Sequence, residues 1–203
     1  MQQVIGAADE PFATLLTVLS MTGLRIGEAL GLLVSDLDFR KRVIQIRRSV
    51  YMGILQTTKS RASIADLPMP AALESRLKDF LVSKWRQNEI GLLFCNRNGK
   101  PYSANKLREK KLHPILDTLK IPRCGFHAIR HGVASELIDS GAPLTVVQAQ
   151  MRHSDARITL GRYGHVVGDS QRNAVAALAQ KIARPELLIP IVDINNSTTV
   201  PVN

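Results

Sequence analysis

The hydrophobic pattern changes between residues 39 and 68, and this change constrains the fold more than any other feature of the sequence. Short β-branched runs, VIQIRRSVY and then ILQTTKSRASIADLPM, replace the helical spacing found on either side. Such runs, joined by turns near Gly53 and Ser60, are typical of two or three antiparallel strands. The stretch therefore predicts a small antiparallel sheet inserted into an otherwise helical chain.

Apolar residues recur at helical spacing before and after this stretch. The first strong helix has Asp9 available as its N-cap, tolerates Pro11 in its first turn and meets Gly23 at its end. The predicted fold class is α+β, a mostly helical domain with a small three-stranded antiparallel sheet between its second and third helices. Helices are predicted at residues 10–21, 24–33, 70–85, 103–119 with Ser103 as cap, 126–139, 143–151 and 156–163, and from Asp169 or Ser170 to Ala183.

The charge of the chain is strongly positive and uneven. Its 203 residues carry a formal net charge of +10, and a cationic protein attracts polyanions. Residues 1–39 hold five acids against Arg25 alone, whereas residues 40–65 hold seven cations and no acid. This asymmetry favours a nucleic-acid partner, although a basic solvated face or an association surface has the same bias.

Composition argues against several other classes of protein. No apolar run approaches the length of a membrane span, and the N-terminus lacks the features of a secretory signal. We therefore expect a cytoplasmic protein without a membrane partner. Cys95 and Cys124 are too few for a disulfide framework or a zinc site of their own. Because no Walker A loop, carboxylate cluster or HExxH motif is present, we expect neither a metal nor a cofactor.

One helix carries a pair of residues suited to phosphate. Cleaving a phosphodiester without a metal requires cations for the nonbridging oxygens, a nucleophile and an acid for the leaving oxygen. His127 and Arg130 lie three residues apart on a predicted helix, so both can face one ligand. A forked guanidinium beside an imidazole suits a phosphate. The pair alone is weak evidence, because Arg and His on one helix face are usually surface residues.

Three stretches of the chain supply the missing context. They are TGLRIGEALGL around Arg25, FHAIRHGVAS around His127 and Arg130, and MRHSDARITLGRYGHV around His153 and Tyr163. In this order they resemble the three boxes of the tyrosine recombinase (phage integrase) family. The family also has a lysine on a β-turn between the first and last boxes, and Lys59 in TTKSRASIADLPM is placed for it.

The resemblance implies how the phosphate would be held. Arg25 and Arg130 would clamp the scissile phosphate, and His153 would hydrogen-bond to it. Forked guanidiniums match phosphate oxygens better than ammonium groups do, so lysine should not replace either arginine. Glu28, one turn after Arg25, resembles the acidic position of the family and would orient its neighbours.

The resemblance also implies the chemical steps. Tyr163 would attack the phosphate and form a 3′-phosphotyrosyl link, His127 would assist proton transfer at the nucleophile, and Lys59 would protonate the departing 5′ oxygen. A covalent phosphodiester retains the energy of the broken bond, so a second 5′ hydroxyl can rejoin the strand without ATP or metal.

Further basic residues are expected to contact DNA. Arg152 stands where family members usually have glycine, immediately before the histidine of the third box, so the local backbone or its approach to DNA should differ here. Arg152 is itself a candidate phosphate contact. The other predicted contacts are Arg47, Arg48, Arg61 and Lys106.

The same resemblance sets expectations for organisation and assembly. Residues 1–184 would form the catalytic domain, and the helical core-binding domain that normally precedes the first box is expected to be absent. In the tail, residues 185–203, the apolar segment 187–192 is expected to pack on a neighbouring subunit; disorder or packing on its own domain are the alternatives. The expected partners are double-stranded DNA and further copies of the chain, a tetramer on DNA and a monomer in isolation.

Two other functions remain open on the sequence alone. A type IB topoisomerase-like enzyme would use the same clamp and tyrosine but would rejoin the original strand. A catalytically silent DNA-binding module or regulator would keep the basic surface without strand transfer. The wording of the three boxes favours the recombinase.

Overall fold

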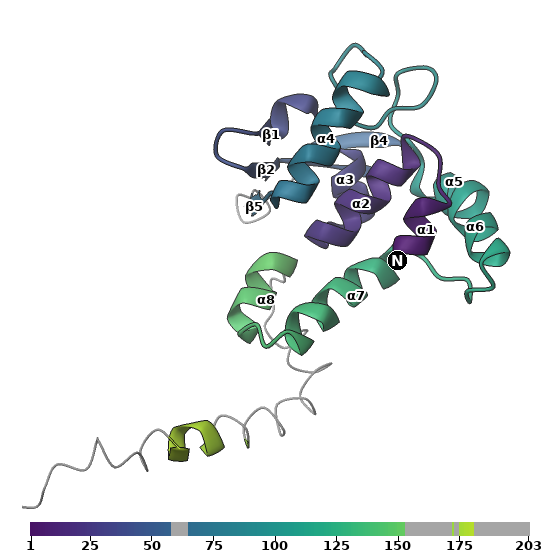
Figure 1. Cartoon of the computed structure of the whole chain (residues 1–203). Helices are drawn as coiled ribbons and strands as arrows, with labels where there is room; N and C mark the ends of the chain where they lie inside the picture. Colours follow the sequence, from purple (N-terminus) through teal and green to yellow (C-terminus); the bar gives the residue numbers. More distant parts are fainter. Residues whose placement is uncertain (58–64, 153–171, 173–174, 181–203) are drawn as a thin grey trace, which may run out of the picture. The chain divides into compact units, whose positions relative to one another are not determined.

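The computed structural model describes residues 1–57, 65–152, 172 and 175–180 (Figure 1). The chain divides into two compact units, Met1–Ala156 and Arg157–Asn203. The second unit has helical backbone at residues 172 and 175–180. The helix predicted at 156–163, the caps Asp169 and Ser170, and the tail at 185–203 lie outside the described residues. Among the helices that are described, none is long and apolar enough to cross a membrane.

The first unit is mostly helical, as its hydrophobic pattern predicts. Predicted and observed bounds agree for the helix at 126–139 and differ by a few residues elsewhere, while the first short helix was not predicted. Its helices are α1 (Gln2–Gly6), α2 (Phe12–Thr22), α3 (Ile26–Leu30), α4 (Ala71–Ser83), α5 (Ala104–Leu107), α6 (His113–Thr118), α7 (Phe126–Asp139) and α8 (Leu144–Met151), with a 3₁₀ turn η1 (Val34–Asp36) and a π turn η3 (Arg108–Leu112).

The strands form two antiparallel sheets between α3 and α4. One has the order β1 (Leu37–Asp38), β2 (Val43–Ile46), β5 (Ala65–Pro68), which confirms the predicted three-stranded sheet. The other, not predicted separately, is the hairpin β3 (Arg48–Tyr51) and β4 (Ile54–Thr57). Met52 and Gly53 at its turn both have positive φ, 49° and 80°, which suits the twist of a two-residue hairpin loop. The predicted turn near Gly53 is confirmed, whereas Ser60 lies outside the described residues.

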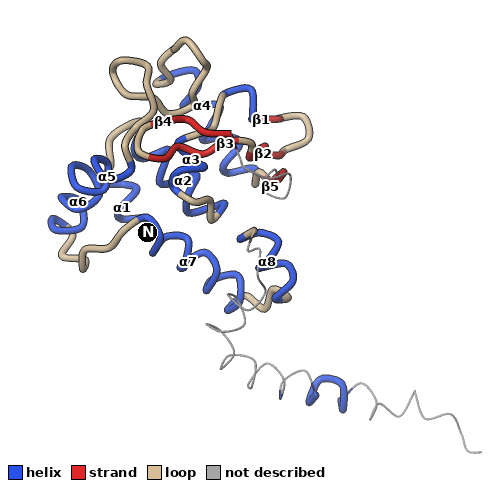
Figure 2. Tube along the Cα trace, turned by 180° about the vertical axis from the view of Figure 1, so that it is seen from behind, coloured by secondary structure: helices blue, strands red, loops and turns tan. Residues whose placement is uncertain are grey.

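Helix α2 is the centre of the core. It is buried on nearly all sides, as expected for a helix that is apolar around its circumference. It lies between α4 and α7 and contacts both (Figure 1), and the rings of Phe12 and Phe126 meet edge to face at 6.1 Å. Viewed from behind, α2 and α3 separate the strands from α7 and α8 (Figure 2). Because α2 packs against α7 and α7 packs against α8, the ends of these three helices are fixed relative to one another.

The start of α2 corrects one prediction. Asp9 is not its N-cap: the helix begins at Phe12, after Pro11. The carboxylate of Glu10 instead accepts hydrogen bonds from the backbone N–H of Thr14 at 3.3 Å and from its hydroxyl at 3.0 Å. A glutamate has one methylene more than an aspartate, and Glu10 uses that reach to satisfy a free N–H of the first turn.

The basic helix predicted from Ser103 has an irregular middle. The Ser103 hydroxyl accepts from the Lys106 N–H at 3.4 Å, which confirms the cap. Pro114 then lies within the run, and its ring and missing N–H are incompatible with a regular α-turn. The chain widens into η3 just before it, where the His113 N–H bonds to the Arg108 carbonyl five residues back.

Candidate active site

Arg130 joins the three sequence boxes. It lies on α7 and is buried. Its Nη1 donates to the carbonyl of Gly23 at 2.6 Å, and its Nη2 donates to the carbonyl of Met151. These carbonyls stand at the ends of α2 and α8, where backbone oxygens lack helical partners and a positive charge is favourable. One guanidinium from the second box thereby holds the first and third boxes together.

Gly23 makes this junction possible. Its backbone is left-handed, with φ of 68°, and it ends α2 as predicted. A Cβ at this position would collide with the side chain of Met151. The left-handed turn is the reason for glycine here, and the end of the Met151 side chain fills the space beside it.

Arg25 and Glu28 form a local unit at the start of α3. Arg25 precedes the helix in extended backbone. The Glu28 carboxylate accepts from the Arg25 backbone N–H at 2.9 Å and from its Nη1 at 3.1 Å. Helix α3 packs closely against β3. A Cβ placed on Gly27 would lie only 2.6 Å from the carbonyl oxygen of Val50. The Glu28 carboxylate thereby holds both the backbone and the side chain of Arg25; its role in catalysis stays a prediction.

Arg152, which follows α8 and is far from Glu28 in sequence, contacts the same carboxylate. It follows α8 in a left-handed conformation, with φ of 50° and ψ of 48°. Its side chain is only 10% exposed, and Nη2 forms an ion pair with Glu28 Oε1. Its Nη1 is buried and has no hydrogen-bond partner among the described residues.

These groups form a guanidinium cluster, which we define as Arg25, Arg130 and Arg152 around Glu28. Burial is the main reason why the pKa of Arg130 is lowered to about 10. The positive charges of Arg25 and Arg152 also lower this pKa, whereas Glu28 opposes them. Arg130 remains protonated at neutral pH, so positive charge exceeds negative charge here and an anion would be attracted.

His127 lies one turn before Arg130 on α7, as predicted, and it is exposed where Arg130 is buried. Its ring meets that of His131 edge to face, with 4.4 Å between centroids.

The other predicted site residues divide into three groups. Arg47, between β2 and β3, and Lys106, on α5, are exposed. Arg48 is engaged inside the protein, because its Nη1 contacts both oxygens of buried Asp36 at 3.0 and 2.7 Å. Lys59, Arg61, His153 and Tyr163 lie outside the described residues.

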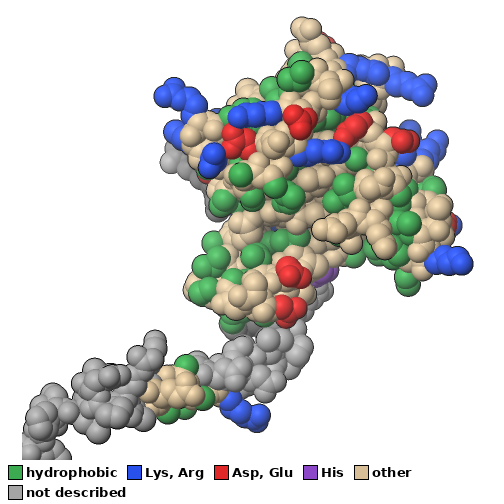
Figure 3. Space-filling model, in the orientation of Figure 1, with side chains coloured by type: hydrophobic (Ala, Val, Ile, Leu, Met, Phe, Trp, Pro, Cys, Tyr) green, Lys and Arg blue, Asp and Glu red, His purple; other side chains and the backbone are tan. Residues whose placement is uncertain are grey.

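Cations are distributed unevenly over the surface. On the face in Figure 3, Lys and Arg side chains stand out around the strands and α4, whereas the part formed by α7 and α8 presents mainly hydrophobic, acidic and uncharged groups.

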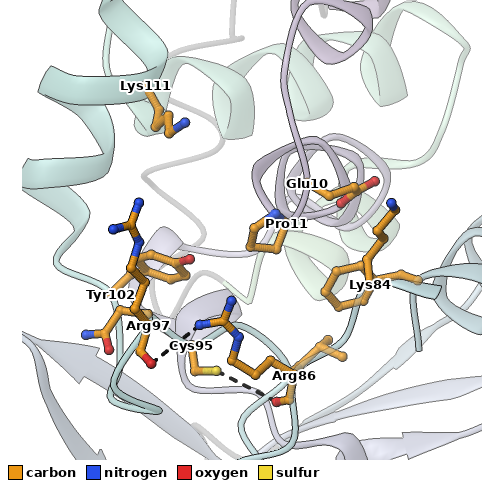
Figure 4. A pocket seen from close by; sticks show the side chains of 11 residues that line it. Glu10, Pro11, Lys84, Arg86, Cys95, Arg97, Tyr102 and Lys111 are labelled. Carbon is orange, nitrogen blue, oxygen red and sulfur yellow. Dashed lines mark hydrogen bonds between the residues drawn. The ribbon is translucent and has the colours of Figure 1, made fainter. Parts of the chain in front are cut away.

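A second basic site was missed by sequence reasoning. A hollow of about 420 Å³ is bordered by Lys84, Arg86, Arg97 and Lys111 and shares no lining residue with the guanidinium cluster (Figure 4). Burial raises the pKa of Tyr102 in its wall. The four cations come from three segments of the chain, at 84–86, 97 and 111, so no short sequence motif identifies the hollow.

The comparisons with known proteins agree with the three boxes. The sequence model of the phage integrase family matches residues 1–168. The chain belongs to the phage integrase family. This confirms the resemblance on which the site residues were predicted.

Individual relatives fit this integrase assignment. The chain is 32% identical to a tyrosine recombinase XerC-like protein of Caldanaerobacter subterraneus subsp. tengcongensis, over 77% of this chain and 46% of that protein. It is 25% identical to the integrase of Staphylococcus phage L54a, over 82% and 50% respectively. The chain thus spans about half the length of these relatives.

Solved structures support the fold of this integrase-family chain. The Tn1549 transposon integrase in complex with circular intermediate DNA matches with a TM-score of 0.76 at 23% identity, covering 87% of this chain and 64% of that one. XerA recombinase matches with a TM-score of 0.66 at 20% identity, covering 78% and 54%. The α+β fold predicted from the sequence is confirmed.

Proposed function

We propose that the chain is the catalytic domain of a site-specific tyrosine recombinase that cleaves and rejoins DNA strands through Tyr163. The observation that carries the proposal is the position of Arg130. It is a buried guanidinium that bonds to the first and third boxes and has Arg25 beside it in a cluster with excess positive charge. A fold that gathers arginines around one carboxylate is suited to binding a phosphodiester.

The arginines act on the charge that develops during cleavage. Attack on phosphorus places additional negative charge on the nonbridging oxygens, and fixed guanidiniums stabilise it without reorganising. Arg130 is fixed by two backbone carbonyls, and Arg25 is fixed by Glu28. His153 contributes a further hydrogen bond to the same phosphate.

Three residues carry the proton and bond changes. The Tyr163 oxygen attacks phosphorus, and exposed His127 helps to remove its proton. Lys59 protonates the 5′ oxygen as the bond to phosphorus breaks. The product is a 3′-phosphotyrosyl link and a free 5′ hydroxyl, and a second 5′ hydroxyl reverses the step on a new strand. No metal or cofactor takes part in this scheme.

The proposal includes the partners. Double-stranded DNA binds along the basic surface, with Arg47, Lys106 and Arg61 as contacts to the DNA backbone. The solved structures that resemble this chain include a XerH recombinase bound to its difH substrate, which supports this choice of partner. On DNA the chain assembles as a homo-tetramer, in which the segment 187–192 docks on a neighbour, and it acts in the cytoplasm. Deleting residues 185–203 should weaken that assembly.

The direct test is covalent capture. A nicked suicide duplex of randomised sequence is incubated with the chain in the presence of a chelator, and a denaturing gel reveals any protein–DNA adduct. Wild type should give an adduct that Tyr163→Phe abolishes. Tyr51→Phe is the matched control, because Tyr51 is 65% exposed on β3.

The outcomes separate the competing functions. An adduct that survives Tyr163→Phe would contradict the assignment of the nucleophile. DNA binding without an adduct from wild type would favour a silent DNA-binding module, and relaxation of supercoiled DNA without strand exchange would favour the topoisomerase-like enzyme.

A further inference from the structure

The backbone at Arg152 is unusual for a residue with a side chain. Its φ of 50° lies in the left-handed region, where a Cβ approaches the following carbonyl oxygen and which glycine enters without this penalty. The turn after α8 thus has the geometry of a glycine C-cap but holds an arginine. The need for a side chain at this position outweighs the backbone cost.

The position of the side chain indicates what it does. Arg152 is nine-tenths buried, which is rare for an arginine without full pairing. Its Nη2 is paired with Glu28, but the buried Nη1 has no partner in the described part of the chain. A buried donor without an acceptor is costly and calls for an explanation such as an absent ligand.

The surroundings define the chemistry of that ligand. Glu28 is the carboxylate shared by Arg25 and Arg152, and its charge is already opposed by more than one guanidinium. The unpaired Nη1 therefore belongs to a group of side chains with excess positive charge. A phosphodiester or phosphate anion supplies both an acceptor oxygen and the missing negative charge.

We propose that Arg152 is a third phosphate-binding guanidinium of the site, held by Glu28 so that its free Nη1 donates to a nonbridging oxygen of the scissile phosphate. This inference rests on the proposed function for the identity of the phosphate. Glu28 is a positioning residue in this arrangement, because it sets the guanidiniums from the first and third boxes side by side.

The test compares two glycine substitutions. Arg152→Gly removes the guanidinium and leaves a residue that adopts the observed backbone without strain, so the variant is expected to fold. Lys120→Gly is the matched control, because Lys120 is an exposed cation that also has a positive φ, 55°. Arg152→Lys keeps the charge but lacks the fork.

The first measurement uses inorganic phosphate as the probe. Thermal unfolding of each variant is followed in sodium phosphate and in sodium chloride at equal ionic strength. Phosphate should raise the melting temperature of wild type and Lys120→Gly, whereas Arg152→Gly should lose most of this response. An equal response from Arg152→Gly and wild type would overturn the proposal.

The second measurement distinguishes the scissile phosphate from a free one. In single-turnover covalent capture on the nicked duplex, Arg152→Gly should react about 10- to 100-fold more slowly, the effect of losing one charge-assisted hydrogen bond. The cleavage rate of Arg152→Lys should lie between those of Arg152→Gly and wild type, and the rate of Lys120→Gly should equal that of wild type. Loss of the phosphate response with an unchanged cleavage rate would overturn the assignment to the scissile phosphate.

Failure of the proposed function gives a different pattern. If wild type forms no adduct, the recombinase proposal fails, but the phosphate response of Arg152→Gly still decides whether Arg152 binds phosphate. The two proposals can therefore be rejected independently.

Discussion

Two groups of arginine and carboxylate side chains occupy different parts of the same domain and differ in net charge. In the turn η1, Asp36 contacts a single cation among the described residues, Arg48, through both of its oxygens, and it also accepts a hydrogen bond from the Leu33 N–H at 2.8 Å. In the guanidinium cluster, Glu28 contacts Arg25 and Arg152, and buried Arg130 lies in the same field. The first pair is neutral, and the second has excess positive charge.

An arginine that is largely withdrawn from solvent does not by itself mark a binding site. Arg48 and Arg152 are both basic residues that the sequence suggests as DNA contacts. Arg48 is satisfied by Asp36, which makes it a structural residue in the DNA-free protein, whereas Arg152 retains an unpaired nitrogen. The ratio of carboxylates to guanidiniums separates the two roles.

The largest effect is expected from Arg130→Lys. An ammonium group cannot reach two carbonyls and a phosphate as the fork does, so the rate of covalent capture should fall about 10²- to 10³-fold. Arg76→Lys is the control, because Arg76 bonds to Thr14 and pairs with Glu10 away from the cluster. Unchanged capture by Arg130→Lys would remove Arg130 from the proposed clamp, and an equal fall in Arg76→Lys would point to general destabilisation.

Glu28→Gln should give the next largest effect, on folding. Removing the only carboxylate of the cluster leaves nine-tenths-buried Arg152 unpaired, so the free energy of unfolding in chloride should fall by about 3 kcal/mol. Phosphate supplies a substitute charge and should restore part of this loss. Urea unfolding in the two salts at equal ionic strength measures the difference, and a loss that is independent of phosphate would contradict the description of the cluster as an anion site.

Asp36→Asn sharpens the contrast. It leaves Arg48, whose side chain is 23% exposed, without a charge partner, and partial exposure limits the expected loss to about 2 kcal/mol. Because this pair has no excess charge, phosphate should not restore the loss. If the same urea measurement gave an equal phosphate rescue for Asp36→Asn and Glu28→Gln, the distinction between the two pairs would fail.

Local patterns were enough to predict much of the fold. The helix at 126–139, the end of α2 at Gly23 and the insertion of strands after α3 all depend on residues close in sequence. The π turn before Pro114 and the division of the strands between two sheets depend on competition between backbone partners. Periodicity does not describe such competition, and neither feature was predicted.

The candidate site was likewise predictable only where it depends on residues close in sequence. Short motifs named Arg25, His127 and Arg130, and the family match supports those motifs. The pairing of Glu28 with Arg152 was not predictable, because it joins the ends of two helices that only tertiary packing brings together. Arg152 has the left-handed backbone that glycine adopts most readily, so the difference expected at this position lies in the side chain and not in the backbone.

The smallest effect on folding is expected from Arg25→Gln, which tests whether the cluster is overcharged. Arg25 is 47% exposed, so its 3.1 Å pair with Glu28 contributes little in water. Its positive charge also opposes protonated Arg130, and removing it relieves that repulsion. The two changes should nearly cancel, leaving the free energy of unfolding within about 0.5 kcal/mol of wild type in urea, while covalent capture falls because half of the proposed clamp is gone. A loss of stability as large as that of Asp36→Asn would mean that Arg25, like Arg48, is needed mainly to balance its carboxylate.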